Sequence, residues 1–312
     1  MSRVQDVYPE GRVSLREVGL RDGLQLVKTF PSTAAKQRWL REEYVAGVRH
    51  FEVGSFLPPK TFPQFADVRD IVAAVAALPG AHGIALVLNE RGANEALASG
   101  VAEIASVVSA TEEHSQANAN RSRESAIANV RRLCELRDAS THKPIVHAAI
   151  SMALGCSISG EVDPNEVLRL VEKCLEAGVD AVGIADTVGY AGPKQVGDLT
   201  RGAVKIAGKR PICVHLHDTR GMGIANASAA LDQGAQILDG SLGGCPFAPG
   251  ATGNVVFEDL VFLCESKGFA TGIDIEKLIA VRAILKEAMP NEPLYGGLAR
   301  AGLPCASTAK AA

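Results

Sequence analysis

The stretch EAGVDAVG, residues 176–183, decides the fold, because it joins the end of a helical pattern to the start of a strand. Its glycine, Gly178, occupies the position of a favoured helix C-terminal cap, and a β-branched run begins at the next residue. The same junction recurs along the chain as AGVRHFEV (46–53), ASGVAEIA (98–105) and DQGAQILD (232–239). This recurrence indicates that helices and strands alternate.

Outward from these junctions, short runs rich in β-branched residues alternate with longer, alanine-rich amphipathic stretches. We predict strands at residues 13–18, 50–54, 83–88, 104–109, 145–151, 181–185, 212–217 and 236–239. The predicted helices include residues 33–46, 66–77, 122–137, 164–177, 194–206, 223–232 and 255–266. Eight strand–helix units in about 250 residues predict a (β/α)8 barrel of the α/β class. A doubly wound open sheet shows the same alternation, but no glycine-rich dinucleotide fingerprint follows the first strand.

Composition and charge narrow the possible classes of protein. The chain of 312 residues is 47% hydrophobic and 21% charged, which is typical of a soluble globular protein. No linker rich in proline, serine or charge divides it, so we predict one barrel domain over residues 1–312, with residues 273–312 as a C-terminal extension. The net charge is −3 and no basic patch is visible, so a nucleic-acid partner is not expected.

The apolar runs, the N-terminus and the cysteines of the chain indicate where in the cell it is expected to lie. No apolar run approaches the roughly 18 residues of a membrane span, and the N-terminus lacks the apolar core of a signal peptide. The seven cysteines include no CxxC pair, which favours a reducing compartment. We therefore expect a cytoplasmic protein without a membrane partner, and we expect it to form a homodimer or homotetramer.

Two predicted strands end in side chains that are suited to metal chemistry. In a barrel of this kind the active site lies at the C-terminal ends of the strands. The first strand is followed by Arg21 and Asp22, and the seventh ends in His-Leu-His. His215 and His217 share one face of their strand and lie about 7 Å apart along it. Together with Asp22 they form a candidate metal site; the alternatives are an ion-paired surface turn and structural histidines.

The loop at residues 241–254 contains four glycines and two prolines. Two interpretations are open: a plain connection, or a lid with glycine hinges that closes over substrate and carries one reactive thiol, Cys245. The other six cysteines lie mostly in helix or strand contexts and are interpreted as small core residues.

Six stretches carry a resemblance to a known family: EVGLRDGLQ (17–25), FEVGSF (51–56), SMALGC (151–156), ADTVGYAGP (185–193), VHLHDT (214–219) and GGCPFAPGATGN (243–254). With them the sequence resembles the 3-hydroxy-3-methylglutaryl-CoA lyase family, within the metal-dependent barrel lyases and acyltransferases that share an Arg-Asp-Gly motif. The stretches follow the family's order over nearly the whole chain, and together they are highly specific.

The resemblance implies a divalent metal, with Mg²⁺ or Mn²⁺ most suitable, and an acyl-CoA thioester substrate. It also implies functional positions, which are Asp22, His215, His217 and Asn254 for the metal; Arg21, Glu52, Asp186, His215 and Cys245 for catalysis; and Gln25, Ser55 and Asn118 for substrate binding.

The implied reaction is the cleavage of 3-hydroxy-3-methylglutaryl-CoA to acetoacetate and acetyl-CoA by a retro-Claisen step. Arg21 would stabilise the enolate oxygen, and Cys245 would protonate the enolate carbon. His215 or a hydroxide ion at the metal would remove the hydroxyl proton. Asp186 would orient groups nearby, and Glu52 is expected either to take part or to pair with Arg21.

Two departures from the family pattern bear on the substrate. Residues 239–245 form a shorter segment than the family's usual span, which affects how Cys245 reaches the substrate. Residues 52–58 read EVGSFLP, where the family usually has a threonine-serine run before the phenylalanine. One alternative is therefore a lyase for another 3-hydroxyacyl-CoA, such as citramalyl-CoA.

Two other classes are weighed against the lyase. An acyltransferase that condenses acetyl-CoA with a 2-oxo acid shares the Arg-Asp-Gly turn, but Leu24 stands where its glutamate is usual, and the cysteine loop is not typical of it. A non-catalytic binding barrel would be expected to have lost the metal ligands, and all four are present.

Overall fold

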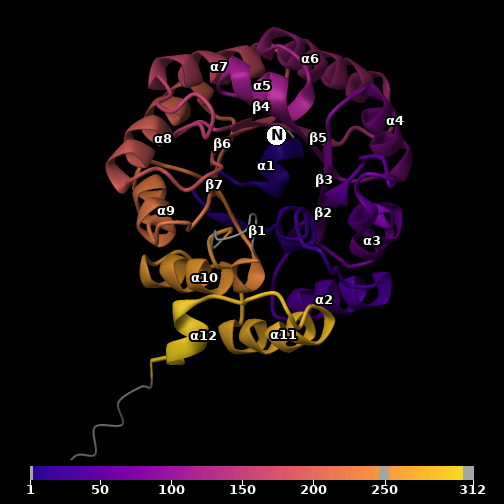
Figure 1. Ribbon diagram of the computed structural model, residues 1–312, viewed down its shortest axis with the longest axis vertical. Coiled ribbons are helices and arrows are strands. Elements are labelled where there is room, and N and C mark those ends of the chain that lie inside the picture. Colours follow the sequence, from indigo (N-terminus) through magenta and orange to yellow (C-terminus); the bar gives the residue numbers. More distant parts are fainter. Residues whose placement is uncertain (1–2, 246–252, 305–312) are drawn as a thin grey trace, which may run out of the picture.

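A closed barrel of eight parallel strands forms the centre of the protein (Figure 1). The computed structural model describes residues 3–245 and 253–304. Each strand pairs with the next along the chain and β8 pairs with β1, so this sheet has no free edge. The strands are β1 (Ser14–Glu17), β2 (His50–Ser55), β3 (His82–Val87), β4 (Glu103–Ser109), β5 (Ile145–Ser151), β6 (Ala181–Asp186), β7 (Ile212–Leu216) and β8 (Ile237–Gly240). The predicted (β/α)8 fold is confirmed, and each strand limit lies within one residue of its prediction.

Helices form an outer ring around the barrel (Figure 1). The ring consists of α2 (Thr33–Val45), α3 (Val68–Ala76), α4 (Glu90–Ser99), α6 (Arg123–Ala139), α7 (Pro164–Glu176), α8 (Pro193–Ala207), α9 (Gly223–Asp232) and α10 (Phe257–Ser266). Beyond the eighth unit, α11 (Ile275–Ala288) and α12 (Gly297–Ala301) pack on α2 and α10. Three short helices, α1 (Arg3–Val7), α5 (Glu112–Ala119) and α12, were not predicted. None of the helices in the described part of the chain combines the length and apolar character that a membrane span requires.

The glycine junctions turn the chain from helix into strand as the sequence indicates. Gly178 follows α7 with a φ of +100°, a backbone conformation that glycine adopts without steric cost. Its amide donates to the carbonyl of Leu175 at 3.1 Å. Two residues later, the amide of Asp180 already donates to the carbonyl of Val146 in β5, at 2.8 Å. The junction therefore places β6 beside β5 within a few residues.

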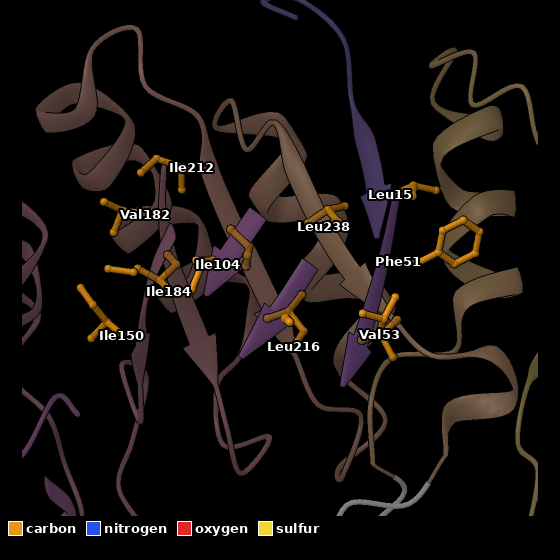
Figure 2. Close-up of a cluster of buried hydrophobic side chains, with 14 of the residues drawn as sticks. Leu15, Phe51, Val53, Ile104, Ile150, Val182, Ile184, Ile212, Leu216 and Leu238 are labelled. Carbon is orange, nitrogen blue, oxygen red and sulfur yellow. The ribbon is translucent and has the colours of Figure 1, made fainter. Parts of the chain in front are cut away.

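The main hydrophobic core fills the space between the strands and the helices. Leu15, Val182 and Leu238, which face outward from the barrel, are at most 5% exposed. Figure 2 shows them within a larger cluster of buried side chains on the strands. Burying one such side chain contributes roughly 1.5–3 kcal/mol to stability, so the alternation of outward apolar residues holds the barrel inside its ring of helices.

The inside of the barrel holds a network of buried charges. Arg16 of β1 places Nε and Nη2 at 2.6 and 2.9 Å from the two carboxylate oxygens of Asp239. Its Nη1 lies 3.2 Å from Glu103, and Tyr8 donates its hydroxyl to the same Glu103 carboxylate at 2.7 Å. Buried charges are tolerated where they are paired and hydrogen-bonded. This network, which Tyr8 joins from the residue after α1, was not predicted from the sequence.

The segment after β7 pairs with the segment before α10. β7 stops at Leu216, one residue earlier than predicted, and His217 instead forms an isolated antiparallel bridge with Asn254. The amide of Asp218 donates to the carbonyl of Gly253 at 2.9 Å. The segments that follow β7 and β8 therefore lie against each other.

Candidate active site and metal centre

A tight turn after β1 presents Arg21 and Asp22 at the C-terminal end of the barrel. Residues Gly19–Gly23 form a single π-helical turn, in which the carbonyl of Val18 accepts from the amide of Asp22 at 2.8 Å. A Cβ on the glycine that opens the turn would lie 2.5 Å from an oxygen of Glu17, so only glycine fits there without displacement. The turn therefore sets the direction of both functional side chains.

Three of the predicted metal ligands converge at this end of the barrel. Oδ2 of Asp22 lies 3.5 Å from Nε2 of His217 and 3.8 Å from Nε2 of His215. The two Nε2 atoms are 3.1 Å apart. The fourth predicted ligand, Asn254, donates from Nδ2 to Oδ2 of Asp22 at 3.0 Å. The structure thus brings all four residues together, from β7 and from the segments after β1, β7 and β8.

The chemistry of this cluster fits a divalent cation. Oδ1 of Asn254 is buried and has no hydrogen-bond partner among the described residues, which leaves an acceptor free for a cation. Atoms bound to one octahedral ion at roughly 2.0–2.1 Å lie about 3 Å apart, close to the separations seen here. One carboxylate, one amide oxygen and two imidazoles form a mixed oxygen and nitrogen set that binds divalent ions.

At Asp22 and His217, local electrostatics favour the protonation states that such an ion requires. Burial acts to raise the pKa of Asp22, but the charge of Arg21 and the hydrogen bond from His217 hold it well below its usual range. Burial lowers the pKa of His217, although Asp22 acts in the opposite direction. An anionic carboxylate and a neutral imidazole are the forms that coordinate metals.

Arg21 lies beside the cluster, where it is held by three partners. Its Nε atom is 2.8 Å from Oε2 of Glu52, and its Nη1 atom donates to Asp22 at 2.5 Å and to Gln25 at 3.1 Å. Burial acts to lower the pKa of Arg21, but Glu52 and Asp22 outweigh it and raise this pKa above the ordinary value. The guanidinium is therefore a permanent, oriented positive charge, and its contact with Glu52 corresponds to one of the two roles considered for that carboxylate.

A cavity of about 490 Å³ opens at this cluster. Its walls include most of the residues assigned to the site from the sequence: Arg21, Asp22, Gln25, Glu52, Asn118, His215 and His217. Apolar side chains of the mouth, such as Leu57, Phe62 and Met152, form another part of the wall. A cavity that joins a metal cluster, a fixed cation and apolar walls suits a small anionic substrate with a hydrocarbon part.

Four predicted site residues lie outside the cavity wall: Ser55, Asp186, Cys245 and Asn254. Ser55 is buried at the end of β2, and its hydroxyl has no hydrogen-bond partner among the described residues. Asp186 ends β6 and accepts from the amides of Tyr190 and Ala191 at 2.9 and 3.1 Å. Asp186 thus holds the loop after β6, and its charge acts on the nearby His217.

Cys245 is placed next to the site, but not in it. The thiol is fully buried, does not line the cavity, and donates to the carbonyl of Leu242 at 3.7 Å. A Cβ on Gly23 would lie 2.8 Å from Cβ of Cys245, so the cysteine packs directly behind the Arg-Asp turn. Most of the predicted lid, residues 246–252, falls outside the described residues.

Sequence reasoning missed two residues behind His215. Asp239, its neighbour in the register of β8, accepts from Nδ1 of His215 at 3.0 Å, and Arg16 pairs with both oxygens of that carboxylate. A histidine whose Nδ1–H is donated to a carboxylate presents Nε2 to the metal in a fixed orientation. The signal was present as charged residues inside otherwise apolar strands, at positions 16 and 239.

Replacing Asp239 with asparagine is expected to weaken metal binding about 10–100-fold, because outer partners of metal-bound histidines contribute on that scale. Titration calorimetry of the metal-free protein with Mn²⁺ measures the change. The exposed Asp198→Asn serves as the matched control and should bind as the wild type does. Unchanged affinity in a folded Asp239→Asn protein would show that Asp239 does not orient His215.

The strand ends of a (β/α)8 barrel here present a carboxylate, two imidazoles and an arginine to one cavity, which defines a metal-dependent barrel enzyme. The chain belongs to the HMGL-like family, whose model matches residues 12–285.

Relatives and solved structures resemble this chain over most of its length. Hydroxymethylglutaryl-CoA lyase YngG from Bacillus subtilis is 34% identical over 290 residues, covering 92% of this chain and 96% of the relative. The 3-hydroxy-3-isohexenylglutaryl-CoA/hydroxymethylglutaryl-CoA lyase from Pseudomonas aeruginosa is 36% identical over 271 residues, 86% of this chain and 90% of that relative. An HMG-CoA lyase from Acinetobacter baumannii, in complex with coenzyme A and 3-methylmalate, matches with a TM-score of 0.86 and 32% identity, over 93% of this chain and 95% of that one.

Proposed function

We propose that the protein is a divalent-metal-dependent carbon–carbon lyase that cleaves 3-hydroxy-3-methylglutaryl-CoA into acetoacetate and acetyl-CoA. The observation that carries the proposal is the position of the Arg21 guanidinium beside the cluster of Asp22, His215 and His217, at the wall of one cavity. The names of the relatives support the same reaction, and coenzyme A bound to the solved relative supports an acyl-CoA substrate.

The metal site is proposed to consist of Asp22, His215, His217 and Asn254. Mg²⁺ or Mn²⁺ suits this mixed oxygen and nitrogen donor set best. When bound, the ion would lower the pKa of the tertiary hydroxyl and hold the carboxylate end of the substrate.

Arg21 is proposed to stabilise the thioester enolate that remains after the C2–C3 bond breaks. Its charge is fixed by Glu52 on one side and Gln25 on the other, so little reorganisation is needed as negative charge develops. The side chain is only 14% exposed, which strengthens its interaction with an anion by excluding water. Gln25 and Asn118 are proposed to contact the substrate from the same wall.

His215 has two proposed roles, ligand and base, which require the same nitrogen. Its Nδ1 faces Asp239 at 3.0 Å, so Nε2 is the atom that faces Asp22 and His217. The short separations between these ligand atoms support the role as ligand. Burial acts to lower the pKa of His215, but the hydrogen bond to Asp239 and the charges of Asp22 and Asp239 together outweigh it and raise this pKa, which would assist His215 as a base. Asp186 is proposed to position the neighbouring His217 and the loop after β6.

Cys245 is proposed to protonate the enolate carbon. Burial raises the pKa of its thiol to about 12, so the thiol carries its proton at neutral pH. The role requires the thiol to reach the cavity that it now lies behind.

Cys245→Ala should therefore lower turnover about 100-fold, on the scale of a general acid, while leaving metal content intact. Steady-state kinetics and elemental analysis measure the two effects. Cys264→Ala in α10 removes an equally buried thiol, whose pKa burial likewise raises to about 12, and is the matched control. Wild-type turnover in Cys245→Ala would remove the cysteine from the mechanism, and loss of metal would make its role structural.

Product analysis tests the function itself. The metal-loaded protein is incubated separately with 3-hydroxy-3-methylglutaryl-CoA, with citramalyl-CoA, and with acetyl-CoA plus a 2-oxo acid. We expect acetoacetate and acetyl-CoA from the first thioester and no condensation product from the last mixture. Cleavage of citramalyl-CoA alone would change the substrate, and condensation would change the reaction class.

A cytoplasmic location and a homodimer or homotetramer are also proposed, and light scattering measures the assembly.

A further inference from the structure

The cavity extends well below the predicted metal ligands, into the barrel. On β6, Ala185 is in register with His215, whereas Ala181 is in register with His147. Arg16 links the two levels, because its guanidinium contacts both Nδ1 of His147 and the carboxylate of Asp239, the partner of His215. Both His215 and His147 line the same cavity, so it runs from the ligand cluster down to the charged network. We call the lower part, lined by Leu86, Ala105, His147, Ala149 and Gly183, the inner chamber.

Small residues on three neighbouring strands create the inner chamber. Ala105 of β4 is in register with His147 of β5, and Ala149 of β5 is in register with Gly183 of β6. The whole cavity of about 490 Å³ is several times the volume of about 150 Å³ that accommodates a benzene molecule. A substrate whose C3 branch is a methyl group would leave the inner chamber unused.

His147 offers a hydrogen bond at the floor of the chamber. Nη1 of Arg16 lies 3.0 Å from Nδ1 of His147, and because arginine can only donate, Nδ1 is the acceptor. Burial foremost, together with the charge of Arg16, lowers the pKa of His147 and favours the neutral ring, in which an Nδ1 acceptor leaves the proton on Nε2. That Nε2 is buried and has no hydrogen-bond partner among the described residues. It points at Gly183, where an added Cβ would lie 2.7 Å away.

We propose that the inner chamber receives a C3 substituent larger than methyl, with an apolar stem and an oxygen acceptor that Nε2–H of His147 binds. This inference rests on the proposed lyase function and specifies its substrate class, a 3-hydroxy-3-alkylglutaryl-CoA with an oxygenated branch. Leu86, Ala105 and Ala149 supply the apolar walls for the stem. The oxygen of the branch would give Nε2–H of His147 a hydrogen-bond partner, and without one this buried donor carries a desolvation cost.

The reaction balances for any branch R. The substrate R–C(OH)(CH2COO⁻)–CH2CO–SCoA loses its hydroxyl proton, and the bond between C3 and the thioester CH2 breaks. The electron pair of that bond goes to the thioester enolate, and one proton returns to its carbon. The products are R–CO–CH2–COO⁻ and acetyl-CoA, so the branch leaves unchanged on the 3-oxo acid.

Three thioesters test the proposal on the full-length, Mg²⁺-loaded protein, with R as methyl, n-hexyl or 5-oxohexyl. A six-carbon branch extends roughly 6 Å beyond C3, because a C–C bond is about 1.5 Å long. We expect kcat/KM for the 5-oxohexyl substrate to exceed that for the methyl substrate at least tenfold, with n-hexyl between them. If the methyl substrate is cleaved best, the chamber proposal is wrong and the lyase function stands. If n-hexyl equals 5-oxohexyl, the hydrogen bond to His147 is wrong. If no thioester is cleaved, the proposed function itself is wrong.

Two variants test whether the preference for a long C3 branch arises in the inner chamber. Ala149→Leu fills the stem region and should lower the kcat/KM ratio of either long-branched substrate to the methyl substrate at least tenfold. Gly183→Ala places a methyl group against Nε2 of His147 and should remove the preference for 5-oxohexyl over n-hexyl. Ala102→Leu, the same change just before β4 and outside the cavity, should leave both ratios unchanged. Unaltered ratios in folded Ala149→Leu and Gly183→Ala proteins would place the branch elsewhere. If either variant fails to fold, the wild-type comparison still decides.

Discussion

Replacement of Arg21 by glutamine is expected to lower kcat by about two to three orders of magnitude, the cost of removing one preorganised donor from a developing oxyanion. Glutamine keeps a donor and much of the side-chain length but removes the positive charge. The charge acts mainly when the enolate forms, so the loss should appear in kcat more than in KM.

The structure defines the controls for this experiment. Glu52 is the buried partner of Arg21, and burial foremost raises the pKa of its carboxyl group. Loss of Arg21 leaves this carboxyl group without its cation, so circular dichroism and thermal melting must show that the variant folds. Arg38→Gln removes an exposed arginine paired with Glu287 and should be kinetically silent. A folded Arg21→Gln protein with wild-type kcat would contradict the role of the guanidinium.

Removal of the metal is expected to abolish activity, and added Mg²⁺ or Mn²⁺ should restore it. Asp22, His215 and His217 converge at the cavity wall, and their oxygen and nitrogen donors suit a divalent cation. A ligand that binds only the folded state also stabilises it, so the melting temperature should fall on chelation and recover with the ion.

Elemental analysis must verify that the chelated protein is metal-free, and circular dichroism that it remains folded. Activity that persists after verified removal would reject the metal-assisted mechanism. Recovery with Zn²⁺ alone would retain the mechanism and change the ion.

The local sequence was sufficient for the parts of the site that lie on short, contiguous stretches. Arg21 and Asp22 follow directly after a strand, and His215 and His217 alternate along one, so their positions at the barrel mouth follow from strand geometry. The strand limits were predicted within one residue, because glycine caps and β-branched runs are local signals.

Features that depend on neighbouring strands could not be predicted in the same way. Asp239 supports His215 only because β7 and β8 pair in the observed register, and a shift of one residue would turn the carboxylate outward. Cys245 stands in the expected loop, yet whether its thiol lines the cavity or packs behind Gly23 is a matter of tertiary packing.

The sequence by itself determined the barrel, the order of its units and the residue types available for catalysis, because hydrophobic periodicity and capping act over a few residues. Only the tertiary structure decided that Arg16, Glu103, His147 and Asp239 form one buried network, and that small residues leave a chamber above it. Both depend on how eight strands close into a ring, which sets inward-facing side chains from distant segments against each other.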